Sequence, residues 1–146
     1  MSKYFNPKEW LPEETYLMLE DTGKVQYADR YIDDRVLITA DKLRSIFGTT
    51  FGNTWSLPAD VTNVYGIHNY RGWRSMDCKI GAEFSAHKFG QAMDLVFVNI
   101  ESKHVREYVL EKPENFPYIT ELETGISWFH YRVGIRNGEM IKLIHP

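Results

Sequence analysis

The sequence contains little cysteine, no long apolar run and no excess of positive charge. Its single cysteine, Cys78, cannot form an intramolecular disulfide, so the chain is not a disulfide-stapled secreted scaffold. One thiol also excludes a cysteine-rich structural zinc site, which leaves histidine and carboxylate as the ligands for a metal. The formal net charge of −3 argues against attraction to nucleic acid phosphates or anionic lipids, so we expect no nucleic acid partner and no membrane partner.

Repeats, low-complexity tracts and linkers rich in glycine, serine or proline are also missing. No segment approaches the roughly 18 apolar residues that span a bilayer, and the first residues lack the apolar core of a signal peptide. The length of 146 residues and the 43% hydrophobic content suit one folded domain over residues 1–146. We expect a monomer that is synthesised in the cytoplasm without a signal peptide.

Two segments have the periodicity of helices. The first covers residues 39–47, with Thr39 or Asp41 as the N-cap and Gly48 placed to end it. The second covers residues 102–111, and Pro113 ends its pattern. Residues 49–84 mix glycine, proline, asparagine and tryptophan without a sustained period, so we expect mostly irregular structure with short strands there.

Two further segments have the pattern of strands, residues 92–99 and residues 128–136. In the second, alternation places His130 and Arg132 on one face and the intervening apolar residues on the other. Asn137-Gly138 predicts a type I′ hairpin turn into a strand over residues 139–144. Helices and strands do not alternate regularly, which predicts an α+β fold: a single small domain with an antiparallel sheet packed with a few helices.

Three residues in the second half of the chain have the chemistry of a metal site, and a glycine between two of them could form the turn that brings these together. His87 lies in a loop, Gly90 can adopt a special backbone angle, and Asp94 enters a strand. With His130 from a neighbouring strand, two imidazoles and one carboxylate would leave a fourth position for water, as in catalytic zinc sites. By spacing alone, Asp94 could equally be a surface residue of the strand, His130 a half-buried aromatic and Gly90 an ordinary turn.

The segment SAHKFGQAMD (residues 85–94), with WFH (residues 128–130) downstream, resembles a known signature. It is similar to the SxHxxGxAxD motif and terminal histidine of the zinc D-alanyl-D-alanine carboxypeptidase and L-alanyl-D-glutamate endopeptidase family, whose hedgehog-like fold also occurs in phage endolysins. Upstream, RGWRS (residues 71–75) resembles the SGxR stretch of phage-type members, and residues 41–48 and 52–55 resemble their LRxxFG and INNW segments. The resemblance covers roughly residues 35–136.

The resemblance implies a role for each matched residue. His87, Asp94 and His130 would bind one zinc ion per chain. Ser85 would support the His87 loop beside the substrate. Arg74 would bind the substrate carboxylate or the developing oxyanion, and the alternative for Arg74 is a solvated surface arginine.

The sequence departs from the family pattern at two positions. Ser127 stands three residues before His130, where well-known members carry the acidic general base, and a serine hydroxyl cannot take a proton from water. Glu123 is the better match to relatives whose glutamate lies farther ahead, and Glu121 shares its face of the strand. Arg132 replaces an aspartate of many phage-type members, so it either faces the cleft or pairs with one of these two glutamates.

The resemblance implies a zinc peptidase that hydrolyses a peptide bond by metal-activated water. The expected substrate is the peptidoglycan stem peptide or a D-Ala-containing dipeptide, cleaved in the manner of a D-Ala-D-Ala carboxypeptidase or an L-Ala-D-Glu endopeptidase. A phage lysin of this kind would reach the periplasm or cell wall on lysis. The alternative is a catalytically degenerate, zinc-containing binding or structural module of a phage or cell-wall protein.

Overall fold

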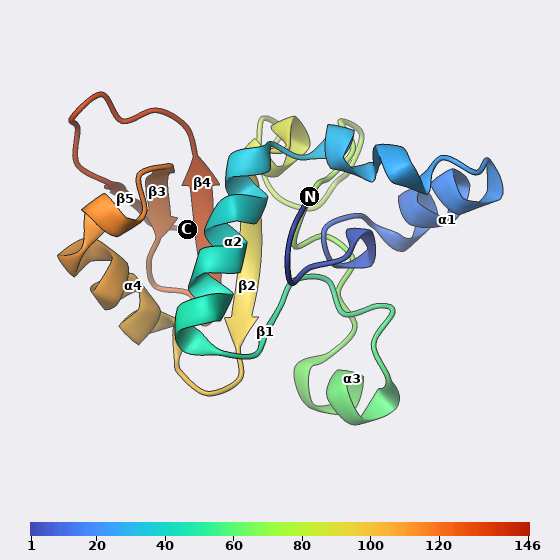
Figure 1. Cartoon of the computed structure of the whole chain (residues 1–146), viewed down its shortest axis with the longest axis horizontal. Helices are drawn as coiled ribbons and strands as arrows, with labels where there is room; N and C mark the ends of the chain where they lie inside the picture. The colour runs from blue at the N-terminus through green and yellow to red at the C-terminus, as the bar shows by residue number, and fades with distance from the viewer.

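The computed structural model describes residues 1–146 as a single α+β domain, which confirms the predicted fold class (Figure 1). The α-helices are α1 (Glu13–Asp21), α2 (Asp34–Phe47), α3 (Ala59–Tyr65) and α4 (Ser102–Glu111). Short 3₁₀ helices are η1 (Pro7–Glu9), η2 (Val25–Tyr31), η3 (Ala86–Phe89) and η4 (Pro113–Asn115). The strands are β1 (Thr50–Phe51), β2 (Ala92–Phe97), β3 (Ile119–Glu123), β4 (Phe129–Val133) and β5 (Lys142–Ile144). None of the helices combines the length and apolar character needed to cross a membrane.

The five strands form one mixed sheet in the order β1-β2-β4-β3-β5. All pairs are antiparallel except β3 with β5, which run parallel, so the expectation of a purely antiparallel sheet is wrong at this edge. The turn at Asn137-Gly138 forms, with φ of 49° and 82°, but the predicted hairpin does not. Since β2 and β3 already flank β4 on both sides, the next strand cannot pair with β4, and it adds to the free edge of β3.

Helix α2 begins five residues earlier than the sequence pattern predicts. Its N-cap is Asp33, whose side chain accepts a backbone hydrogen bond in the first turn, so the prediction of Thr39 or Asp41 as N-cap is wrong. Thr39 is buried within the helix, and the carboxylate of Asp41 accepts hydrogen bonds from the N-terminal segment. Gly48, at φ 84°, ends the helix as predicted.

The other predicted helices and strands are partly confirmed and partly wrong. Helix α4 has the predicted bounds, and strands β2 and β4 lie within the predicted segments. Residues 49–84 contain the short strand β1 but also α3, a helix that the mixed composition concealed. Helix α1 and the 3₁₀ helix η2 lie ahead of every predicted element and pack against the rest through Leu19 and Ala28.

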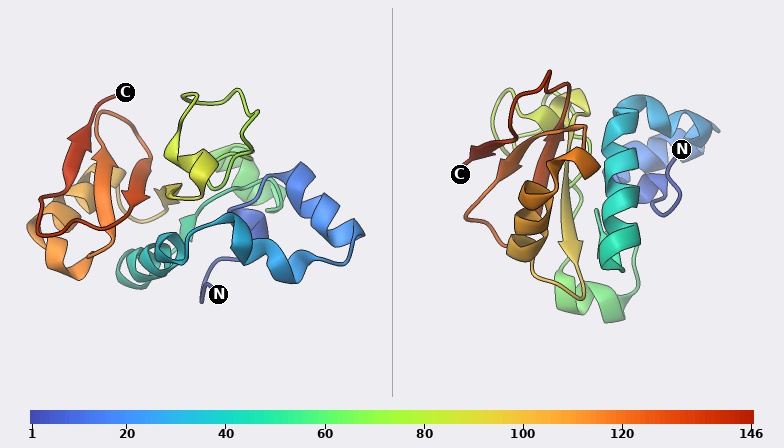
Figure 2. Two further views of the ribbon diagram at one scale, coloured as in Figure 1. Left: turned by 90° about the horizontal axis from the view of Figure 1, so that it is seen from above. Right: turned by 60° about the vertical axis from the view of Figure 1, so that its left-hand side comes forward.

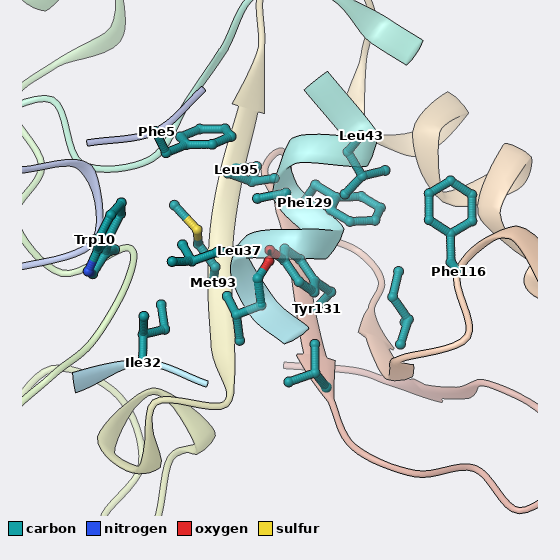
Figure 3. Packing of buried hydrophobic residues seen from close by; sticks show 14 of the residues in the cluster. Phe5, Trp10, Ile32, Leu37, Leu43, Met93, Leu95, Phe116, Phe129 and Tyr131 are labelled. Atoms are coloured by element: carbon teal, nitrogen blue, oxygen red, sulfur yellow. Dashed lines mark hydrogen bonds between the residues drawn. The ribbon is translucent and has the colours of Figure 1, made fainter. Parts of the chain in front are cut away.

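The hydrophobic core lies between the sheet and the helices α2 and α4 (Figure 3). Met93 and Leu95 of β2 and Phe129 and Tyr131 of β4 are fully buried in it, and the Tyr131 hydroxyl donates to the Val36 carbonyl of α2 at 2.7 Å. Because neighbouring residues of a strand point to opposite faces, the even-numbered residues of β2 and β4 face away from the helices. The segment before η3 covers that second face (Figure 2, left).

Candidate metal centre

His87 is held by a short 3₁₀ helix with a defined residue at each end. Ser85 is the N-cap of η3, and its hydroxyl accepts a hydrogen bond from the His87 backbone N–H at 3.4 Å. Gly90 ends η3 in the left-handed conformation, where a Cβ would collide with the Tyr31 carbonyl oxygen. The chain can therefore reverse from His87 directly into β2, and Ser85 lies where the resemblance requires support for the loop.

Asp94 and His130 come together because their strands pair directly. They are opposite residues in the antiparallel ladder of β2 and β4, and both point to the face that the helices leave uncovered. Opposite side chains in such a pair have Cβ atoms about 5 Å apart, close enough for direct contact. His87 and Asp94 are 2% and 7% exposed, and the His130 side chain is 12% exposed.

The three side chains bring one ligand atom each to a common point. The Nε2 atom of His87 lies 3.3 Å from Nδ1 of His130 and 3.3 Å from Oδ1 of Asp94, and the last two atoms are 2.7 Å apart. Ligands bound tetrahedrally to zinc at its usual bond lengths are about 3.3 Å from one another. Two of the three separations match this value and the third is a hydrogen-bond distance, and the predicted ligand cluster is the group of this chain that could hold a metal ion.

The second nitrogen of the His87 ring determines which atom is available to a metal. Nδ1 of His87 lies 2.7 Å from the carbonyl oxygen of Gly72, an acceptor that requires a proton on Nδ1. In the neutral ring, Nε2 therefore carries the lone pair, and it points to Asp94 and His130. A backbone carbonyl that fixes the tautomer in this way is typical of metal-binding histidines.

The carboxylate of Asp94 is ionised despite its burial. Burial raises its pKa, but the adjacent imidazoles of His87 and His130 outweigh that effect and hold the pKa well below its usual range. Metal ligands must be deprotonated, so Asp94 is available as a ligand at neutral pH. Its second oxygen, Oδ2, is 3.3 Å from Nη2 of Arg74, which completes a buried ion pair.

Arg74 is part of this cluster and not a solvated surface arginine. It is 8% exposed, and besides Asp94 its guanidinium donates to the carbonyls of Tyr70 at 2.7 Å and Ile80 at 3.3 Å. Burial lowers the pKa of Arg74 and the Asp94 carboxylate opposes that effect. In this structure Arg74 holds the candidate ligand Asp94 and fixes the segment that covers the sheet.

A cleft of about 370 Å³ opens beside the cluster. Asp94 forms part of its wall, and Arg71, Arg74, Tyr70 and Trp128 line it together with four residues of the covering loops: Ile67, His68, Asn69 and Ile80. A larger cavity of about 760 Å³ lies at η4 and the turn after β4, but it includes no ligand of the His-Asp-His cluster. Of these two, the smaller cleft is therefore the one that borders the cluster.

The two glutamates that are candidates for the general base have different surroundings in the structure. Glu121 is 3.7 Å from Arg132 and 4.0 Å from Lys142, so its carboxylate is engaged in ion pairs, as is Arg132. Leu122 lies opposite Tyr131, and the next pair in this antiparallel register is Glu123 with His130. Asp94 and His130 are therefore paired directly, whereas Glu123 follows Leu122 at the end of β3 and does not line the cleft.

Sequence reasoning missed three contributors to the site. Arg71 lines the cleft, Gly72 supplies the carbonyl that orients His87, and Arg106 of α4 donates to the carbonyls of Ile126 and Trp128 at 3.1 and 3.0 Å. None of these residues has a local pattern that indicates its role, because each acts on a part of the chain that is distant in sequence. Only the pairing of distant segments reveals them.

Comparison of the chain with protein-family models, with curated proteins and with solved structures returned no match. The description of the site therefore depends on its own geometry: a buried His-Asp-His cluster that could hold a metal ion, beside a cleft lined by two arginines.

Proposed function

We propose that the protein is a zinc peptidase that hydrolyses a peptide bond of the peptidoglycan stem peptide. The observation that carries this proposal is the triangle of ligand atoms from His87, Asp94 and His130, which is buried on its inner side and reaches the cleft through Asp94. A three-ligand site with an open side is typical of catalytic metal centres, whereas structural zinc sites are closed by four protein ligands.

The donor set favours zinc over other ions. Imidazole nitrogen suits zinc, copper, iron and nickel, while magnesium and calcium prefer sites made of oxygen ligands. Two nitrogen donors and one carboxylate, with separations close to those of a tetrahedron, agree best with zinc. The number expected is one ion per chain.

Each residue around the cluster has a task in the proposed hydrolysis. His87, Asp94 and His130 would hold the zinc ion, which would supply water of lowered pKa and polarise the scissile carbonyl. Glu123, across the strand from His130, takes the proton from the attacking water and delivers it to the leaving amine. Arg74 keeps Asp94 oriented and adds positive charge beside the developing oxyanion. Ser85 keeps the His87 loop in place at the substrate side.

The choice of substrate has two supports. The first is the resemblance of residues 85–94 and 128–130 to peptidases that act on D-Ala-D-Ala and L-Ala-D-Glu bonds. The second is the cleft itself, whose volume suits a few residues of a peptide and whose wall combines arginines with the half-exposed Trp128. A stem peptide carries both carboxylates and small apolar side chains, so it matches this wall.

The test combines metal content with hydrolysis. We expect near one zinc per purified chain and release of muropeptides from purified peptidoglycan. Glu123→Gln should retain zinc and lose release, and Glu121→Gln is the matched control because Glu121 is held in ion pairs with Arg132 and Lys142. Zinc binding without any release by the unmodified chain would refute the peptidase.

The second candidate is a binding or structural module in which zinc stabilises the fold. The specific observation in its favour is Ser127, which occupies the position three residues before His130 where an acid would be expected. A module of this kind predicts that Glu123→Gln changes no measured property, while chelation of zinc lowers the thermal midpoint. The same variant thus distinguishes the two candidates.

A further inference from the structure

The cavity of about 760 Å³ at η4 and the turn after β4 shares no lining residue with the cleft at the metal centre. Its walls come from residues 110–118 and residues 134–141, and Arg35 of α2 completes the lining. Cavities of roughly 300 to 1,000 Å³ that combine apolar walls with a few polar groups are typical sites for small organic ligands. No residue of this cavity has a task in the proposed hydrolysis.

Arg136 lines this cavity with a charge that no acid of the chain balances. Its Nη2 atom donates to the Pro113 carbonyl at 2.9 Å, whereas its Nη1 atom has no hydrogen-bond partner and is closed off from solvent. Arg136 takes part in none of the ion pairs of the structure. A charged donor that is buried without a partner costs free energy. Because a guanidinium shares its charge among its nitrogens, an anion that contacts it from the cavity compensates the charge at Nη1 as well.

The other charged residues of the lining leave this charge unbalanced. Arg35 donates through Nε and Nη2 to the two carboxylate oxygens of Asp33, at 2.9 and 2.6 Å, so its own charge is paired. Glu114 and Glu139 are exposed and form no ion pair with either arginine. The unbalanced charge therefore matches a monoanion, because the two glutamates would repel a dianion such as phosphate more strongly.

Apolar side chains make up much of the remaining wall. Met140 and Ile135 are 91% and 75% exposed and Leu110 is 39% exposed, whereas Ile141 is buried. The lining is aliphatic apart from the ring of Tyr118. Covering exposed apolar surface lowers the free energy in proportion to the area removed from water. The walls therefore suit a ligand with an aliphatic body.

Hydrogen bonds hold the two walls together without a ligand. The Gly134 N–H donates to the Tyr118 carbonyl at 2.9 Å, which ties the segment after β4 to the segment before β3. The Glu139 N–H donates to the Arg136 carbonyl at 2.8 Å and closes the turn that follows Arg136. A cavity whose walls are fixed in advance loses less free energy to ordering when a ligand binds.

We propose that this cavity binds a small amphiphilic carboxylate, a molecule with one ionised carboxyl group on an aliphatic body, and that Arg136 is the partner of the carboxyl group. The carboxylate supplies the single negative charge and offers two oxygens to a planar guanidinium. Its aliphatic body covers Ile135 and Met140. This site depends neither on the metal nor on the proposed peptidase function.

The test compares three probes that separate the two features of the ligand. Octanoate has both the carboxylate and the aliphatic body, 1-octanol has only the body, and acetate has only the carboxylate. In calorimetric titrations of the full chain, we expect octanoate to bind at least about tenfold more tightly than either of the others. Arg136→Gln should abolish the preference for octanoate over 1-octanol. Octanoate should also raise the thermal midpoint of the unmodified chain more than that of Arg136→Gln.

Two further variants keep the result interpretable. Arg132→Gln removes the same charge from a residue that is paired with Glu121 outside this cavity, so the preference should persist. Arg136→Lys keeps the charge but loses the planar fork, so it should retain only part of the preference. Circular dichroism verifies that each variant is folded.

Several outcomes would overturn the proposal. A preference for octanoate that survives in folded Arg136→Gln would place the carboxylate elsewhere, for instance at the metal centre. Equal affinity for octanoate and 1-octanol would show that Arg136 binds no anion, and equal affinity for octanoate and acetate would show that the walls bind no aliphatic body. If no probe binds and sedimentation shows a dimer, the exposed Ile135 and Met140 belong to a contact between two copies of the chain. None of these results depends on whether muropeptides are released, so this site and the peptidase function fail separately.

Discussion

Replacement of Glu9 by glutamine should change the pH dependence of stability. The Glu9 side chain is 5% exposed at the end of η1, and burial raises its pKa from 4.5 to about 7. Backbone hydrogen bonds from Asn6 and Gly52 and the charge of Arg44 lower the pKa but do not offset the burial. The folded chain therefore holds a proton on Glu9 over a range of pH where the unfolded chain has lost it.

The sign and size of the effect follow from this difference. Between pH 4.5 and 7 the folded state binds more protons at Glu9 than the unfolded state, so the stability from this group falls as pH rises and is lost above 7. The difference in pKa corresponds to about 3 kcal/mol. Glu9→Gln stays neutral and can still accept the Asn6 N–H, so it avoids this loss.

Urea denaturation followed by tryptophan fluorescence measures the effect. The free energy of unfolding of Glu9→Gln, relative to the unmodified chain, should rise by about 3 kcal/mol between pH 4.5 and pH 8. Zinc binding affects both proteins equally and cancels in the difference. Glu20→Gln, at an exposed position of α1, is the control and should give a flat difference. Parallel pH profiles for Glu9→Gln and the unmodified chain would show that Glu9 is ionised in the fold and refute the reasoning.

Three other changes have defined outcomes. His87→Ala should reduce bound zinc to well below one per chain. It should also abolish the rise in thermal midpoint on zinc addition, which in the unmodified chain corresponds to about 4 kcal/mol of stabilisation when the zinc concentration is a thousandfold above Kd. An unchanged zinc content by mass spectrometry would exclude the site. Gly72→Ala places a Cβ against the Trp10 backbone and moves the carbonyl that orients His87, so both the thermal midpoint and the zinc affinity should fall. Only the loss of zinc affinity, measured by competition with a chelator, tests the contact that orients His87. Arg106→Met removes two hydrogen bonds to the loop that carries Trp128 and should lower the free energy of unfolding, measured by urea denaturation, by about 2 to 4 kcal/mol. A change below about 0.5 kcal/mol would show that the loop keeps its conformation without these two hydrogen bonds.

The sequence by itself determined the faces of the central strands. Alternation in residues 128–136 separates His130 and Arg132 from Phe129, Tyr131 and Val133, and the structure buries the second set against the helices. It also determined the turn chemistry, because a residue without a side chain is needed at Gly48 and Gly90. These features are local, so nearby residues are sufficient to predict them.

The candidate ligands also follow from sequence, but their availability does not. Residue type indicated His87, Asp94 and His130, and spacing alone left open whether Asp94 is a ligand or an ordinary surface residue of the strand. Burial of the carboxylate among two imidazoles and Arg74 decides that question, and it depends on the pairing of β2 with β4 and on a loop from residues 66–85.

Only the tertiary structure decided which charges are free. Arg74 and Arg71 are three residues apart and chemically identical, yet the first is engaged on three sides and the second opens into the cleft. The parallel strand β5 is a similar case, since the Asn137-Gly138 turn predicts a hairpin but β4 has no free edge to receive it. In both cases the outcome depends on which hydrogen-bonding groups the folded chain has already engaged, by Asp94 at Arg74 and by β2 at β4, and a local pattern carries no record of them.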